Sequence, residues 1–530
     1  MGNLELLCIF PSSHCSSRGP SRRKSHGNSC MATPSIVHHP HQRWSLDRLS
    51  TELLVLILQK LGDADPESLA AARLLSTRFN AITTPIKYYT LRLTERIIAP
   101  QAETYFPDGL ANIYTHTRHV KVDNDLNPEQ VKEVLNKIER LSSVRWRYVQ
   151  DILLKGHFWV PADILNPRHI HVNRIKLYIE NLPLRNIRSE QYNPYLRAIP
   201  TEILVSLKMA NPTPPLTTRL ENLKGLLQES TRLETFSYED RGQGSQFTFT
   251  GTERLPAFKD LSLRSYDWNH TADAVRKHWD FSEIRHLEMV DVPMFQFLTS
   301  VLFSDFQQLE TLRLEDFSTH LPDRRRDATR GQYILIKQIR ALIDLKITCH
   351  IQSFPVDGIL HHARSLRSLC FRDYVGFSDE YRRCPTLRIE DLNHMSRNLV
   401  NLRILELDMD EALCEPTQFL RALCNFRHLD TLILHTQTVL DVFESVNPDT
   451  DPDHRRAVQM FITLDRGKQG ASWRSITINV GGWKRIMVRR LSAPWREQNS
   501  RGVYAERCFK LERNSDGHLL MHEEPANEPS

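Results

Sequence analysis

The segment Leu309-Glu-Thr-Leu-Arg-Leu314 carries the pattern on which most of this 530-residue chain is built. Apolar and polar residues alternate along it, and a period of two predicts a strand with one buried face. Similar segments recur at steps of 24 to 44 residues. Their central apolar residues are Phe236, Leu261, Leu287, Leu312, Leu345, Leu369, Leu405, Leu432 and Ile476, and weaker copies centre on Leu91, Val120, Val144, Ile175 and Leu204.

Helical patterns lie between most of these segments, for example over residues 271–278 and 417–423. Strands that alternate with helices predict crossover connections and a parallel sheet, so the fold class is α/β. About fourteen strands are too many for one ordinary open sheet, whereas a short period repeated many times is typical of a solenoid. We therefore expect an irregular solenoid of parallel strands with outer helices over residues 88–480.

Residues 44–87 show a different pattern, that of three short helices. Leu53, Ile57 and Leu61 recur every fourth residue, which predicts one apolar face on the first helix. We expect this helix to end at Gly62. Asp65-Pro66 predicts the start of the second helix. Ser76 is the expected cap of the third helix, and Pro85 is expected to end it.

The order of these anchors resembles the F-box. The match consists of Leu49-Ser50-x-Glu52-Leu53, Ile57-Leu58-x-x-Leu61, Leu69 and Leu74-x-Ser76-x-x-Phe79. Ser50 stands where the family usually has proline. The segments that follow resemble leucine-rich repeats, so the chain is similar to a fungal-type F-box protein with a divergent leucine-rich-repeat-like body. The Asn or Cys that usually follows each repeat strand is absent after Leu314 and Leu407, so we expect an irregular solenoid.

The resemblance implies a non-catalytic substrate-recognition subunit of an SCF-type cullin-RING ubiquitin ligase. It implies that the F-box binds a Skp-family adaptor, and through it a cullin, while the solenoid holds an unknown target protein. The adaptor-facing residues would be Leu49, Glu52, Leu53, Ile57, Leu58, Leu61, Leu69, Ser76 and Phe79. The apolar members of this set could equally hold the three helices together.

The target would bind to the strand face that points away from the buried core. If Leu312 and Leu314 point inward, Arg313 and Glu315 point outward, because side chains alternate along a strand. The same rule applied to all repeats gives the target-binding set Arg264, Glu288, Arg313, Glu315, Lys346, Arg372, Glu406, Asp408 and His435. The set mixes both signs, with Arg264, Lys346 and Arg372 in the middle of the chain and Glu406, Asp408 and the nearby Asp410 later, so we expect a partner with matching charge segregation.

The two ends of the chain have their own composition. Residues 1–43 are rich in Ser, His and basic residues and are expected to be disordered, with Met31 as an alternative start. They hold five basic residues and one acidic one, so the body is nearly neutral although the chain carries +5. Residues 481–511 are basic and are expected to cap the solenoid with strands at 486–488 and 503–511. Residues 512–530 are acidic and expected to be disordered.

Motifs for other chemistry are absent. There is no phosphate-binding glycine loop, no G-x-S-x-G and no H-E-x-x-H. His361-His362 is interpreted as part of a solvated helix face. The nine cysteines are scattered without zinc-ligand spacing, which favours free thiols in a reducing compartment and no cofactor or metal.

The expected location is therefore the cytoplasm or the nucleus, without a membrane span. Two alternatives stay open. One is a leucine-rich-repeat scaffold that works outside a ligase. The other, less favoured, is a nucleic-acid-binding protein that uses the basic and aromatic residues of 483–510.

Overall fold

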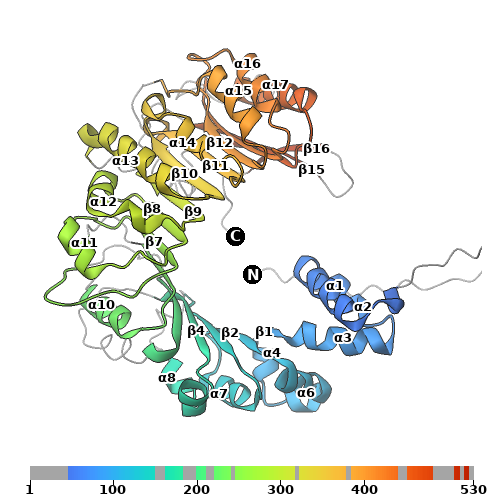
Figure 1. The fold of residues 1–530 in the computed structure, drawn as a ribbon. Helices are drawn as coiled ribbons and strands as arrows, with labels where there is room; N and C mark the ends of the chain where they lie inside the picture. The colour runs from blue at the N-terminus through green and yellow to red at the C-terminus, as the bar shows by residue number, and fades with distance from the viewer. Residues whose placement is uncertain are drawn as a thin grey trace, which may run out of the picture. The chain divides into compact units, whose positions relative to one another are not determined.

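The computed structural model describes most of the chain (Figure 1). The described residues are 46–149, 161–182, 199–209, 220–239, 245–316, 321–377, 383–439, 451–481, 507–513 and 519–524. The expected tail at 1–43, the strand expected at 486–488 and most of the basic 483–510 segment lie outside these ranges. The chain divides into two compact units, Met1–Ile57 and Leu58–Ser530, and the division falls inside helix α1 (Thr51–Ala64).

Among the described residues of the second unit, sixteen strands lie side by side in chain order in one sheet. All neighbours from the first strand to the fourteenth are parallel, whereas the last two pairings are antiparallel. The strands are β1 (Thr90–Arg92), β2 (His119–Asp123), β3 (Ser143–Arg147), β4 (Lys176–Leu182), β5 (Leu204–Met209), β6 (Thr235–Glu239), β7 (Asp260–Arg264), β8 (His286–Val290), β9 (Thr311–Glu315), β10 (Asp344–Cys349), β11 (Ser368–Asp373), β12 (Ile404–Asp408), β13 (Thr431–Gln437), β14 (Ser475–Gly481), β15 (Arg507–Arg513) and β16 (Leu519–Glu524). The prediction of an α/β fold with mostly parallel strands is confirmed.

Helices connect most of these strands, and α10 to α17 lie along one side of the sheet (Figure 1). The remaining α-helices are α2 (Pro66–Ala72), α3 (Thr77–Tyr88), α4 (Glu95–Ile98), α5 (Ala102–Tyr105), α6 (Pro107–His116), α7 (Pro128–Lys137), α8 (Pro161–Ile164), α10 (Leu220–Glu229), α11 (Ala272–His278), α12 (Met294–Ser300), α13 (Arg325–Gln338), α14 (Asp357–Leu360), α15 (Ile389–Asn398), α16 (Pro416–Cys424) and α17 (Pro452–Gly467). The buried apolar side chains of α7, α8 and α10 to α17 share one cluster with those of the strands, whereas those of α5 and α6 form a separate, smaller cluster. Complete burial of each such side chain stabilises the fold by roughly 1.5–3 kcal/mol.

The predicted central residues lie opposite one another across the sheet. From β7 to β14 the register joins Leu261, Leu287, Leu312, Leu345, Leu369, Leu405, Leu432 and Ile476 in one row. Two predictions are wrong by a few residues. Val144 lies opposite Leu177 rather than Ile175, and Phe236 lies opposite Leu207 rather than Leu204.

Acidic and amide side chains satisfy backbone groups in the loops that follow several strands. Asn124 accepts a hydrogen bond from the Val149 N–H at 2.8 Å. Asp373 accepts from the Ile351 N–H at 2.9 Å, and Asp410 accepts from the Cys384 N–H at 2.9 Å. All three acceptors are buried. Asp410 lies at the position where a leucine-rich repeat usually has Asn or Cys, so a carboxylate holds its loop instead.

The helix caps predicted from the sequence are confirmed, but two predicted helix ends are wrong. Asp65 accepts from the N–H groups of Glu67 and Ser68, and Ser76 accepts from that of Phe79. Helix α1 continues past Gly62 to Ala64. A Cβ at Gly62 would lie 2.9 Å from Cδ2 of Leu69, so this glycine permits close packing rather than ending the helix.

Helix α3 also passes through Pro85 and continues to Tyr88. Proline removes one backbone donor, but α3 also packs against α2 and α6, and such tertiary packing contributes most of the stability of a helix in a protein. In the first unit, the Ser50 hydroxyl accepts a hydrogen bond from the Leu53 N–H at 3.4 Å. Ser50 therefore caps α1 at the position where the resemblance leads one to expect proline.

The interpretation of His361-His362 as a solvated face is wrong for His362, which is buried. Its Nδ1 accepts from the Leu342 N–H at 3.2 Å, and its Nε2 donates to the Ile336 carbonyl at 2.9 Å. The imidazole therefore joins Ile336, within α13, to Leu342, two residues before β10, as a neutral group. Burial lowers the pKa of His362 to about 4, because a charge would lose its hydration.

We predict that acidification weakens the fold through His362. An unfolded histidine titrates near 6.5, so the stabilisation is complete above that pH and is lost as pH falls toward 4, by about 2 kcal/mol at pH 5. Thermal midpoints at pH 7 and pH 5 measure this loss. The His362→Gln variant keeps a donor and an acceptor but does not titrate, so its midpoint should fall less. An equal fall in both proteins would contradict the assignment.

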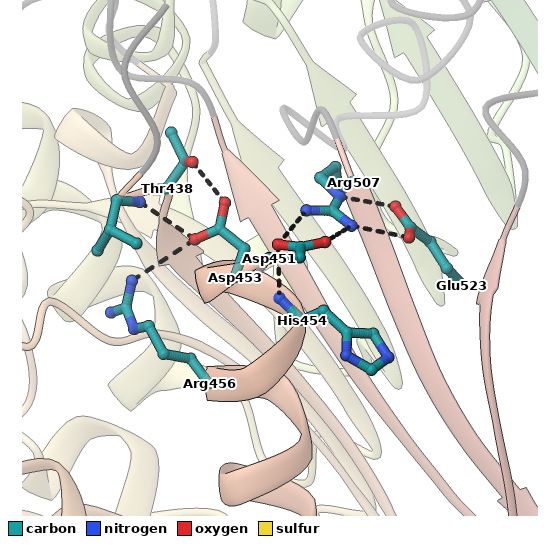
Figure 2. Close-up of polar contacts among 8 residues, drawn as sticks. Thr438, Asp451, Asp453, His454, Arg456, Arg507 and Glu523 are labelled. Carbon is teal, nitrogen blue, oxygen red and sulfur yellow. Dashed lines mark hydrogen bonds and ion pairs between the residues drawn. The ribbon is translucent and has the colours of Figure 1, made fainter. Parts of the chain in front are cut away.

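The C-terminal strands are joined to the last helix by Arg507 (Figure 2). Its guanidinium donates to both carboxylate oxygens of Asp451, at 3.0 and 2.6 Å, and to both of Glu523, at 2.7 and 2.8 Å. Asp451 also caps α17 through the His454 N–H at 3.1 Å. One cation thus connects α17, β15 and β16. The expectation that all of 512–530 is disordered is wrong for β16, because this pairing holds residues 519–524 in the sheet.

We predict that Arg507→Met loosens β15 and β16 selectively. The substitution leaves the buried carboxylate of Asp451 without its cation, which costs roughly 2–4 kcal/mol. Amide hydrogen exchange in β15 should then accelerate at least about 30-fold, while exchange in β2 to β5 is unchanged. Arg276→Met, which removes an exposed pair with Asp273 on α11, is the matched control and should leave exchange as it is. Uniform acceleration across the sheet would contradict the local role.

Candidate functional site

Large apolar side chains are exposed in both units near the start of the chain. In the first unit, Leu53, Leu56 and Ile57 on α1 are 45–59% exposed. In the second unit, Leu74 and Leu75 lie in the turn between α2 and α3 and are 87% and 69% exposed. Leucines with this exposure gain nothing from folding, so they mark surfaces suited to a protein partner.

The predicted adaptor-binding residues divide by burial. Glu52, Leu53 and Ile57 are exposed, and Leu49 and Leu61 are half-buried. Leu58, Leu69 and Phe79 are at most 5% exposed, so the prediction that they face a partner is wrong. They serve the core instead, and Ser76 serves as a helix cap.

The sequence interpretation left Leu56 and Leu75 out of the site, and it used Leu74 only as a motif residue. The signal for these residues was present. Leu74-Leu75 lies between the end of one helix pattern and the cap of the next, where polar residues are usual.

The predicted target-binding residues lie on neighbouring strands, but they contact one another. Glu288 on β8 pairs with Arg264 on β7 at 2.6 Å and with Arg313 on β9 at 3.5 Å. Arg313 also pairs with Glu315. Further along the sheet, Arg372 pairs with Asp408 at 2.8 Å, and His435 pairs with Glu406 at 2.8 Å. These contacts form two clusters of charge, on β7 to β9 and on β11 to β13.

Burial contradicts the expectation that this whole set is exposed. Glu315, Arg372, Asp408 and His435 are at most 5% exposed, whereas Arg264, Glu288, Arg313, Lys346 and Glu406 are half-buried. The buried four occur near the carboxyl ends of their strands. There the chain turns into loops whose backbone also needs partners, and the Asp373 N–H, for example, donates to Asp408 at 3.0 Å. Alternation along a strand does not reveal such loop contacts.

The pKa values reflect this pairing. Burial opposes a charge on Glu406, but the hydrogen bond from His435 and the nearby Arg372 and Lys346 lower its pKa to about 2. Burial lowers the pKa of His435, so at neutral pH this imidazole is a neutral donor to Glu406. Burial raises the pKa of Glu315, and Arg313 offsets part of that rise. Such interior charges stabilise each other and offer little to a partner.

Charged side chains that stay exposed on the same strand face belong to earlier strands. Lys121 on β2 and Lys208 on β5 are exposed, as are Arg92 and Arg145. Arg92 and Arg145 pair with Asp123 and Glu180 at 2.7 and 2.9 Å. Lys121 and Lys208 were not in the predicted target-binding set, because the alternation rule was applied only to the stronger repeats.

The part of the chain that the structure describes contains neither a cluster of metal-binding side chains nor a helix that could span a membrane. There, no three His, Cys, Asp or Glu side chains gather closely enough to hold a metal ion. Cys349, Cys370, Cys384, Cys414 and Cys424 are free thiols, and burial raises the pKa of the first three. None of the described helices combines the length and the apolar character needed to cross a bilayer.

Comparison with known proteins gives no relative: no family model matches the chain, and no curated protein matches it significantly. The two exposed leucine groups and the charged strand face are therefore interpreted from their own geometry.

We predict that Arg372→Met destabilises the sheet by about 3–5 kcal/mol, because Asp408 is left as an unpaired buried charge. Arg145→Met is the matched control, since its pair with Glu180 is partly exposed and should contribute about 1 kcal/mol or less. Urea unfolding midpoints of the two variants measure the difference. Equal midpoints would show that the Arg372 pair is not part of the stable interior.

Proposed function

We propose that the chain is the substrate-recognition subunit of an SCF-type cullin-RING ubiquitin ligase. In this proposal, helices α1 to α3 form an F-box that binds a Skp-family adaptor, and through it a cullin. The strands and helices that follow form a leucine-rich-repeat-like solenoid that holds a target protein. The chain itself is a receptor and carries out no chemistry.

The exposure of Leu74 and Leu75 is the observation that carries the proposal. Two adjacent leucines in water at 87% and 69% exposure are unfavourable unless a partner covers them. Independently, Leu53, Leu56 and Ile57 give α1 an exposed apolar face in the first unit. These residues belong to the segments that resemble the F-box, and apolar anchors of this kind dominate the energy of protein interfaces.

Ser50 stands where an F-box usually has proline, and this difference matters less in the structure than the sequence alone suggests. A proline at the start of a helix fixes the backbone, whereas Ser50 fixes it by capping α1 through the Leu53 N–H. The scaffold alternative rested on this residue, and it stays open. The nucleic-acid alternative rests on 483–510, of which only 507–510 is described, and there Arg507 is held by two carboxylates.

The target would bind to the strand face of the sheet, away from α10 to α17. Within that face, Lys121 and Lys208 are exposed, whereas the clusters on β7 to β9 and β11 to β13 are satisfied internally. The early strands therefore fit a target better than the charge-segregated set expected from the sequence.

The test is capture of a purified Skp-family adaptor by the purified full chain. We predict that Leu74→Ser/Leu75→Ser weakens the affinity roughly 30-fold or more, because two apolar anchors are lost. Leu53→Ser/Ile57→Ser should also weaken it. Both pairs are exposed, so the thermal midpoint of each variant should match that of the wild type.

Leu302→Ser/Leu321→Ser is the matched control, since these leucines are 51% and 43% exposed elsewhere in the chain. This control should capture the adaptor as the wild type does. A well-folded wild type that captures no adaptor would overturn the ligase proposal and leave a scaffold as the better account.

A further inference from the structure

Exposed arginines gather where β11 to β14 begin. Arg367, Arg403 and Arg474 directly precede β11, β12 and β14. Arg364 and Arg427 lie in the turns that lead into β11 and β13. All five side chains are exposed. We call these five residues the arginine edge.

Backbone hydrogen bonds place these residues next to one another. The Arg403 N–H donates to the Arg367 carbonyl at 2.8 Å, and the Asp430 N–H donates to the Arg403 carbonyl at 3.0 Å. The Arg474 N–H in turn donates to the Asp430 carbonyl at 2.8 Å. The residues thus form a row across four strands, with neighbours about 4.8 Å apart. Arg364 and Arg427 lie in the turns before this row, and their carbonyls accept hydrogen bonds from the Asn401 side chain and the Ala471 N–H.

The guanidinium groups of this edge have no partners within the described residues. None of the five appears in an ion pair or a side-chain hydrogen bond there, in contrast to Arg264, Arg313 and Arg372 on the strand face. Asp430 interrupts the row, and its carboxylate accepts from the Thr431 hydroxyl at 2.8 Å. Like charges held this close repel each other, and an anionic partner would remove that repulsion.

Aliphatic side chains are exposed on the same edge. Ile343 precedes β10 and is 38% exposed, and its carbonyl accepts from the Arg367 N–H at 2.8 Å. Val400 and Ile404 flank Arg403 and are 53% and 39% exposed. The strongly exposed aromatic residues of the described chain, Tyr89 and Tyr105, belong to the region of α3 and α5. Single-stranded nucleic acid needs aromatic platforms for its bases, so this surface does not suit it.

We propose that the arginine edge binds an acidic peptide segment that also carries aliphatic side chains. Arginine recognises carboxylates in a bidentate manner, and adjacent arginines suit an extended chain with repeated Asp or Glu. Ile343, Val400 and Ile404 provide contacts for Leu, Ile or Val between the acids. The inference rests on the proposed function only in taking the peptide as part of a target.

The test uses the purified full chain and fluorescence anisotropy. The probe is a labelled twelve-residue peptide that repeats Glu-Glu-Leu, and a Gln-Gln-Leu peptide is its uncharged control. We predict that the wild type binds the acidic probe at low salt and loses it at high salt, and that it does not bind the control. Arg367→Glu/Arg403→Glu should weaken binding at least tenfold. Arg168→Glu/Arg330→Glu changes the charge equally at exposed arginines elsewhere and should leave binding unchanged.

Three results would overturn the inference. They are no binding of the acidic probe by the wild type, equal binding by Arg367→Glu/Arg403→Glu, and tighter binding of a labelled single-stranded oligonucleotide that the same variant abolishes. Adaptor capture by that variant separates this inference from the proposed function. The variant should capture the adaptor as well as the wild type does. If neither protein captures the adaptor, the result counts against the ligase proposal but not against binding of the acidic peptide.

Discussion

The alignment of apolar side chains across adjacent parallel strands is the constraint on which the rest of this structure depends. Leu312 lies in the buried cluster, and the register places Leu287 and Leu345 beside it on either side. A slip of one residue would turn the apolar side chains of a strand to the wrong face, at a cost of several kcal/mol. The register also decides which charges meet. It brings Glu288 between Arg264 and Arg313, and Asp408 beside Arg372.

The charged groups of the second unit follow two different rules. On the strand face of β7 to β13, charges lie in a partly or fully buried setting. Those of the two clusters, on β7 to β9 and on β11 to β13, pair with one another in the same chain. At the starts of β11 to β14, arginines are exposed and have no such partner within the described residues. The first arrangement specifies the sheet, whereas the second is available to another molecule. Exposed leucines at α1, and separately at the turn after α2, are available in the same sense.

The period-two segments predicted the strands well, because alternation is visible within a few neighbouring residues. Apolar residues of every such segment also enter the same buried cluster. The caps Asp65 and Ser76 were predictable for the same reason, since a cap acts within three residues. The errors arise where distant residues decide. Gly62 permits the close approach of Leu69 instead of ending its helix, and Glu315, Arg372, Asp408 and His435 are buried and paired with side chains of the sheet. The strand β16 depends on Arg507, which lies elsewhere in the chain and holds Glu523.

We propose that two parts of the chain bind two different proteins: the N-terminal helices bind an adaptor, and the sheet binds a target. Amide hydrogen exchange of the full chain, measured with and without a purified Skp-family adaptor, tests it most directly. The account predicts slower exchange over residues 46–61 and 71–79, and unchanged exchange in β7 to β14. Protection within β7 to β14 instead, or no protection under conditions where the chain is folded, would contradict it.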